Sequence, residues 1–143
     1  MMHVEVPSKS DVFSKRKRSA VMAAIRSIEN KDTELRFITI LRSQKITGWR
    51  RGSRLPGKPD FVFPRVRLTV FIDGCFWHGC PRHGRKPKQN ADYWLRKLSR
   101  NRARDRKVNR LLREREWRVL RIWEHELSNV ARVTARLRAA LEQ

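Results

Sequence analysis

Acidic residues are scarce in this chain, which has 14 aspartates and glutamates against 35 lysines and arginines among its 143 residues. The formal net charge of +21 and the pI near 11.6 cause a self-repulsion that core packing does not require. A polyanion is the natural compensator. The composition therefore favours DNA or RNA as the partner, with an anionic membrane as the lesser alternative.

Long apolar runs and a disulfide framework are also missing. No apolar run approaches the roughly 18–20 residues that span a bilayer, and the N-terminal residues lack the layout of a secretory signal. The two cysteines are expected to be reduced thiols in a cytosolic setting, available for a metal. The length fits a single domain, predicted over residues 15–143 behind a flexible arm over residues 1–14.

Hydrophobic periodicity predicts the elements in the order α-α-β-β-α-β-α. We expect helices over 19–28, 33–44, 93–116 and 127–141, and strands over 61–63, 66–73 and 117–123. Residues 49–55 form either a short strand or a turn. Leu35, Ile38 and Leu41, and less cleanly Phe37 and Ile40, supply an apolar face to the second helix. This order indicates an α/β fold with a small mixed sheet flanked by helices.

Soft metal ligands are concentrated in one stretch. Cys75, Cys80 and His83 lie within nine residues, and His125 follows the strand predicted over 117–123. Zinc prefers tetrahedral thiolate and imidazole donors. Four protein ligands predict a closed, structural zinc site that links the 75–83 loop to that strand. The alternative is two buried free cysteines and two surface histidines.

Two aspartates lie on consecutive predicted strands. Asp60 follows Pro59 at the start of one strand, and Asp73 ends the next. Adjacent strands that present such oxygens suit Mg²⁺, which also takes phosphate oxygens from a substrate. A PD dipeptide followed by an acid is the core of the PD-(D/E)xK nuclease pattern, although Cys75 occupies the usual lysine position. The alternative is a turn aspartate and a strand-end cap.

His78 stands apart from the zinc set and is a candidate for proton transfer; its alternative is a packed core histidine. Asp105 and Glu34 are candidates to orient it, or else form ordinary surface ion pairs. Beside it, Phe76-Trp77 is either a buried aromatic pair or a wedge that unstacks a weak base step. Met22 is a candidate second wedge.

Several blocks occur together in a specific order: LPGKPDFV (55–62), FIDGCFWH (71–78), YWLRKL (93–98), Asn101 with Asp105, and EWRVLRIWE (116–124). Over roughly residues 15–128 the chain resembles the very-short-patch repair (Vsr) DNA mismatch endonucleases. The resemblance implies a restriction-endonuclease-like fold with a structural zinc. It also implies Mg²⁺-dependent nicking of one DNA strand 5′ of the thymine in a T:G mismatch. The expected enzyme is a monomer of the bacterial cytoplasm, associated with the nucleoid when bound to DNA, with other repair proteins as further candidate partners.

The resemblance also assigns the active-site residues. Asp60 matches the metal-binding aspartate, and the backbone carbonyl of Ile72 falls where a main-chain oxygen contacts magnesium. His78 matches the general base, Asp105 the acid that orients it, and Glu34 a helical glutamate of the active site. Asp73 stands where some members carry histidine, so its role is open: metal ligand, hydrogen-bond partner or neither.

The remaining assignments concern zinc and DNA. Cys75, Cys80, His83 and His125 fall at or near the zinc positions, in a rearranged loop. Phe76, Trp77 and Met22 match residues that intercalate beside the mismatch. The basic helix is expected to position double-stranded DNA, chiefly through phosphates, with Arg96, Lys97, Arg100, Asn101 and Arg104. Two rivals stay open: another nuclease of this fold that cuts at a sequence or a structure, and a non-enzymatic basic zinc module that binds nucleic acid.

Overall fold

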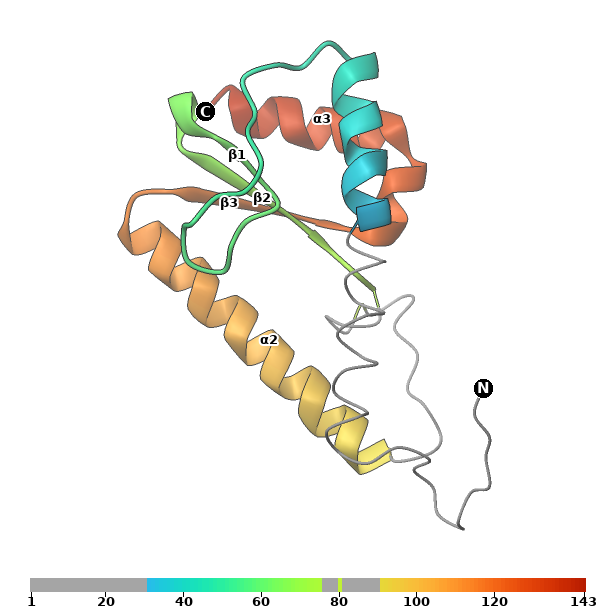
Figure 1. The fold of residues 1–143 in the computed structure, drawn as a ribbon, viewed down its shortest axis with the longest axis vertical. Coiled ribbons are helices and arrows are strands. Elements are labelled where there is room, and N and C mark those ends of the chain that lie inside the picture. Colours follow the sequence, from blue (N-terminus) through green and yellow to red (C-terminus); the bar gives the residue numbers. More distant parts are fainter. Residues whose placement is uncertain (1–30, 76–79, 81–90) are drawn as a thin grey trace.

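The computed structural model describes residues 31–75, 80 and 91–143 (Figure 1). Within them a mixed sheet has the strand order β1-β2-β3. Strand β1 (Phe61–Phe63) runs antiparallel to β2 (Leu68–Asp73), and β2 runs parallel to β3 (Arg118–Trp123). Helices α2 (Ala91–Glu114) and α3 (Val130–Leu141) and a helix over 31–43 accompany the sheet. The predicted α/β class with a small mixed sheet is confirmed.

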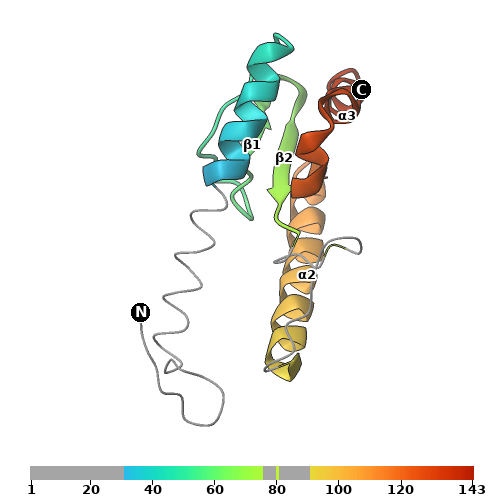
Figure 2. The ribbon, with the colours of Figure 1, turned by 90° about the vertical axis from the view of Figure 1, so that its right-hand side faces the viewer.

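Strand β2 is the centre of the molecule, and all six of its residues are buried. A strand between two neighbours, covered on both faces, has a nearly continuous apolar sequence, as LTVFI does here apart from Thr69. On one face, Val70 and Ile72 join the core formed with the helix over 31–43 and with α3. Figure 2 shows these two helices on either side of β2. On the other face, Phe71 and Asp73 contact Arg121 of β3, whose side chain reaches α2.

Helix α2 reaches well beyond the sheet (Figures 1 and 2). Only Leu98, Asn101 and Leu112 are buried among its 24 residues. The C-terminal half of the helix packs along β3. Most of its arginines and lysines therefore face solvent, where they can meet a polyanion.

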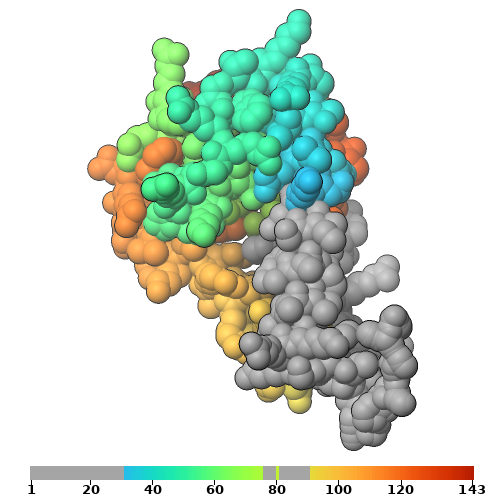
Figure 3. All heavy atoms as spheres, viewed as in Figure 1, coloured from blue at the N-terminus to red at the C-terminus, as the bar shows by residue number. Residues whose placement is uncertain are grey.

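The segment between the helix over 31–43 and β1 is shaped by close packing. Gly57 has φ +78°, and a Cβ added there would lie 2.4 Å from a methyl group of Val108 in α2. Lys58 is also left-handed, with φ 49°. In Figure 3 this segment (teal to green) lies over the strands. The PGKPD turn is thus pressed against α2, and it delivers Asp60 to the sheet.

Several predicted boundaries shift. Strand β2 begins at Leu68 rather than 66, because Pro64–Val66 forms a 3₁₀ helix, η1, that ends at left-handed Arg67. The terminal helix predicted from residue 127 is two elements: the 3₁₀ helix η2 (Glu124–Ser128), then α3, which Asn129 caps by accepting from the Arg132 N–H. In the 49–55 segment, Arg50 forms an isolated bridge with Val62. The helix predicted over 19–28 and the arm over 1–14 lie outside the described residues.

The prediction of which residues form the apolar face of the helix over 31–43 was partly wrong. Leu35 is 50% exposed, whereas Phe37 and Ile40, the less clear members, are buried. Phe37 packs its ring against Phe61 of β1, with centroids 4.9 Å apart. Contact with the sheet, which the helix periodicity alone does not contain, decides which side of the helix is buried.

Candidate active site and metal centre

Asp60 is anchored to the central strand at the edge of an open cavity. Its Oδ2 accepts a hydrogen bond of 2.7 Å from the backbone N–H of Ile72. The carboxylate thereby reaches across from the start of β1 to the C-terminal part of β2. It lines a cavity of about 670 Å³ together with Glu34, Arg51, Arg54 and Lys58, among other residues. The fold therefore brings Asp60 next to Ile72, twelve residues further along the chain.

Glu34 lies in the same cavity, held by an ion pair. Its Oε1 accepts from Nη2 of Arg51 at 2.7 Å. The cavity thus combines two carboxylates with three basic side chains. Carboxylate oxygens suit a hard divalent cation, and guanidinium and ammonium groups suit a phosphate. Such a mixture is what a metal-assisted phosphodiesterase site requires.

Asp73 and Asp105 are joined by a residue that sequence reasoning missed, Arg121. The Arg121 Nη1 lies 2.9 and 3.1 Å from the two carboxylate oxygens of Asp73, and 3.7 Å from Oδ1 of Asp105. Its Nε donates to Oδ1 of Asn109 at 2.9 Å. Asp73 is therefore a hydrogen-bond partner of Arg121. No sequence signal marked Arg121, because its partners are 12 to 50 residues away in the chain and only the fold brings them together.

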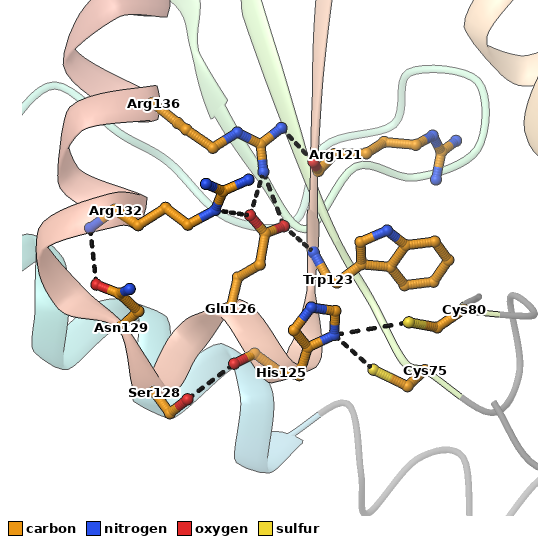
Figure 4. A network of polar contacts seen from close by, with 10 residues as sticks. All are labelled: Cys75, Cys80, Arg121, Trp123, His125, Glu126, Ser128, Asn129, Arg132 and Arg136. Carbon is orange, nitrogen blue, oxygen red and sulfur yellow. Dashed lines mark hydrogen bonds and ion pairs between the residues drawn. The ribbon is translucent and has the colours of Figure 1, made fainter. Parts of the chain in front are cut away.

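Three of the four predicted zinc ligands come together at the end of the sheet (Figure 4). The Nδ1 of His125 lies 3.3 Å from Sγ of Cys75 and 3.6 Å from Sγ of Cys80, and all three ligand atoms lie within 4.8 Å of one another. Zn–S and Zn–N bonds in a tetrahedral site place S and N about 3.5 Å apart. The two cysteines are buried and not joined in a disulfide. This donor set fits a zinc-type metal site.

The protonation of Cys75 bears on that fit. Burial, aided by the neighbouring Cys80 and opposed by a backbone hydrogen bond with His125, raises the pKa of the Cys75 thiol to about 11. In the metal-free protein the thiol is therefore neutral at pH 7. A metal ion that binds there has to displace this proton, so metal affinity rises with pH.

A buried carboxylate, also missed by sequence reasoning, holds the short helix that carries His125. Glu126 accepts from the Trp123 N–H at 2.8 Å, from Arg132 at 3.1 Å and from Arg136 at 2.7 Å (Figure 4). Burial works to raise the pKa of Glu126, but these three donors outweigh it and lower that pKa. The short helix that carries His125 is therefore tied to α3 by an ion-pair network.

The basic helix keeps most of its predicted DNA-binding residues accessible. Arg96, Arg100 and Arg104 are exposed and Lys97 is half-buried. Asn101 is buried, and its Oδ1 accepts from Nη2 of Arg104 at 2.6 Å. In this arrangement Asn101 orients Arg104. The other predicted residues, Met22, Phe76, Trp77, His78 and His83, lie outside the described residues.

Comparison with known proteins places the chain in a family. The family model described as DNA mismatch endonuclease Vsr matches residues 10–83. The chain belongs to the Vsr family of DNA endonucleases. It is 40% identical over 135 residues to the type II nicking enzyme V.XorIIP of Xanthomonas oryzae pv. oryzae, a match that covers 93% of this chain and 98% of that relative. It is 37% identical over 128 residues to the DNA mismatch endonuclease Vsr of Escherichia coli, covering 87% of this chain and 80% of that relative.

A third relative matches more strongly but over a shorter region. The type II nicking enzyme V.NaeI of Lentzea aerocolonigenes is 57% identical over 77 residues, which span 54% of this chain and 46% of V.NaeI. The resemblance deduced from the sequence blocks is thus confirmed, and this Vsr-family chain is a DNA endonuclease. Among its described residues no helix is long and apolar enough to cross a membrane.

Proposed function

We propose that this chain nicks one strand of duplex DNA 5′ of the thymine in a T:G mismatch, in a reaction that depends on Mg²⁺. The single observation that carries the proposal is the position of Asp60. Its carboxylate is fixed on the Ile72 N–H at 2.7 Å and opens onto a cavity lined by basic side chains. A phosphodiester that enters this cavity meets a carboxylate and several cations together.

Asp60 and the backbone carbonyl of Ile72 would hold the magnesium ion. Support comes from the bond between Asp60 Oδ2 and the Ile72 N–H, which puts the carboxylate beside the backbone of that residue; Mg²⁺ takes few protein oxygens and completes its shell with water and phosphate. When bound, Mg²⁺ supplies Lewis-acid stabilisation of the charge that develops on the scissile phosphate. Arg51 and Lys58, at the cavity wall, add positive charge for the phosphate. Glu34 orients Arg51 through their ion pair.

His78 is proposed as the general base that takes a proton from the attacking water, with Asp105 to orient its imidazole. Support for this role comes from the family resemblance and from the side of the sheet on which Asp105 lies. Asp105 faces Arg121, which also contacts Asp73 at the C-terminal end of β2. His78 follows Asp73 by only five residues in the sequence.

DNA binding is assigned to α2 and to three apolar side chains. Arg96, Lys97, Arg100 and Arg104, with Arg104 oriented by Asn101, would hold phosphates of the duplex without reading its sequence. Phe76, Trp77 and Met22 would insert beside the T:G pair. Unstacking costs less where base pairing is already defective, which gives a physical basis for mismatch selection.

Zinc is the proposed occupant of the Cys75, Cys80 and His125 cluster, with His83 as the fourth ligand. Two thiolates and imidazole donors favour zinc over hard cations. With every position taken by protein the ion would be structural. It would join Cys75, just after the end of β2, to His125 in η2.

The test is nicking of an end-labelled T:G duplex and of the matched duplex, each with Mg²⁺ and with EDTA. We expect one cut, 5′ of the mismatched thymine, only with Mg²⁺. Equal cutting of the matched duplex would instead support a sequence-specific nuclease of this fold. Binding without cutting under every condition would support a non-enzymatic zinc module.

A further inference from the structure

We infer that Arg121 is a positioning residue for the nicking reaction, which fixes Asp105 of α2 against the C-terminal end of β2. The inference rests on the proposed function, since it takes Asp105 as the acid that orients the base. It adds a residue that has no role in the site described so far.

The Arg121 guanidinium is held on every side by described residues. Its Nη1 contacts both carboxylate oxygens of Asp73, at 2.9 and 3.1 Å, and lies 3.7 Å from Oδ1 of Asp105. Its Nε donates to Asn109 at 2.9 Å, and its Cζ lies 4.2 Å from the centroid of the Phe71 ring. A planar group fixed by so many contacts has little freedom to move.

These contacts connect three elements at the place where the reaction needs alignment. Asp73 ends β2 directly after Ile72, whose N–H holds Asp60. Asp105 and Asn109 are four residues apart on α2 and therefore share one face of that helix. Arg121 of β3 lies between Asp73 of β2 and this face of α2. Among the described residues, Arg121 thus links Asp105 of α2 to the end of β2 beside the Asp60 cavity.

The charges of Asp73, Asp105 and Arg121 also indicate a positioning role for Arg121. The side chains of Asp73 and Asp105 are only 7% and 21% exposed, so two carboxylates are brought to one partly buried place. Without a cation between them they would repel each other, and a negative charge would remain beside the site of a phosphate. Arg121 compensates this charge. It also distinguishes the two acids, because the hydrogen bonds go to Asp73 while Asp105 is held at ion-pair distance.

The test compares Arg121→Met with a matched control, Arg118→Met. Arg118 is also a half-buried β3 arginine, but its hydrogen bonds go to the carbonyls of Ala140 and Val66 on the other side of the sheet. Single-turnover nicking of a T:G duplex, duplex affinity and thermal unfolding are measured for each. We expect Arg121→Met to lower the nicking rate on the order of 100-fold with unchanged affinity, since small misplacements of catalytic groups have such effects. Arg118→Met is expected to lose stability without losing rate.

Two further variants separate positioning from charge compensation. Adding Asp73→Asn to Arg121→Met removes both charges of that ion pair, so thermal stability should recover. The nicking rate should stay low, because the contact between Arg121 and Asp105 is still missing. Adding Arg121→Met to Asp105→Asn should cause no further loss of rate, since both changes act through one group. Recovery of rate together with stability in the first pair, or additive losses in the second, would overturn the inference.

Asp60→Asn serves as the reference for the proposed function itself. Nicking by Asp60→Asn at the wild-type rate would end that function whatever Arg121 does. Inactive Asp60→Asn and Asp105→Asn variants beside a fully active Arg121→Met would leave the function standing and remove only the role of Arg121.

Discussion

Replacing Gly57 by alanine tests how the Asp60 turn is held. Gly57 has φ +78°, and an added Cβ would lie 2.4 Å from Cγ1 and 3.0 Å from Cγ2 of Val108. A left-handed alanine costs about 1–2 kcal/mol, and overpacking adds about 1–3 kcal/mol. We therefore expect Gly57→Ala to lower the free energy of unfolding by about 2–5 kcal/mol. It should also slow nicking, because Asp60 is three residues away in the same turn.

A control and a rescue separate the two contributions. Gly48 has φ +88° with nothing within 4 Å of the added Cβ, so Gly48→Ala should show only the backbone cost. Adding Val108→Ala to Gly57→Ala removes the methyl groups in the way. The double variant should nick at the wild-type rate. Its free energy of unfolding should stay below that of wild type, because the left-handed alanine and the loss of the valine side chain still cost stability.

The assay is urea unfolding followed by tryptophan fluorescence, with single-turnover nicking of a T:G duplex measured in parallel. Gly57→Ala with the stability of Gly48→Ala and the rate of wild type would refute the close packing of the PGKPD turn against α2. A nicking defect of Gly57→Ala that Val108→Ala does not reduce would also refute this packing.

Three other perturbations have outcomes that follow from the structure. Glu126→Gln should lower the free energy of unfolding by about 3–5 kcal/mol in denaturant unfolding, because a buried ion-pair network loses its negative charge. Folding lowers the pKa of Glu126. The stabilisation by its carboxylate is therefore complete above the unfolded pKa of about 4.3, and it should disappear as the pH falls through the folded pKa. A strong chelator should lower the thermal midpoint, with zinc found by elemental analysis of the untreated protein; an unchanged midpoint and no zinc would contradict the Cys75, Cys80 and His125 site. The logarithm of the duplex affinity should fall linearly with the logarithm of the salt concentration, and Arg100→Ala should reduce the slope of this line by about 1. An affinity that does not change with salt would show that the +21 charge does not drive DNA binding.

Much of the fold could be predicted from local sequence. The β-branched run ending at Asp73 gave β2, and alternation over residues 117–123 gave β3. The long helix α2 followed from its spacing of apolar positions. The break at Pro64–Val66 and the 3₁₀ turn at Glu124–Ser128 were missed, because each depends on single residues: left-handed Arg67 and capping Asn129. Such residues do not change hydrophobic periodicity.

The site divides in the same way. Asp60 lies beside Ile72, and three predicted zinc ligands meet, because the order of the strands brings these positions to one end of the sheet. Arg121 and Glu126 were not found. Both are charged residues whose burial depends on partners in other elements: Asp73 and Asn109 for the first, Arg132 and Arg136 for the second. In a chain with 35 basic residues, composition does not reveal which arginine is structural.

We propose that the Asp60 carboxylate, held on the Ile72 N–H, joins the protein to magnesium and the scissile phosphate. The most direct measurement is single-turnover nicking of a T:G duplex by wild type and Asp60→Asn across a Mg²⁺ titration, with duplex affinity measured for both. We expect Asp60→Asn to bind the duplex as wild type does and not to nick it at any Mg²⁺ concentration. Nicking by Asp60→Asn with the wild-type rate and Mg²⁺ dependence would rule out this role of Asp60.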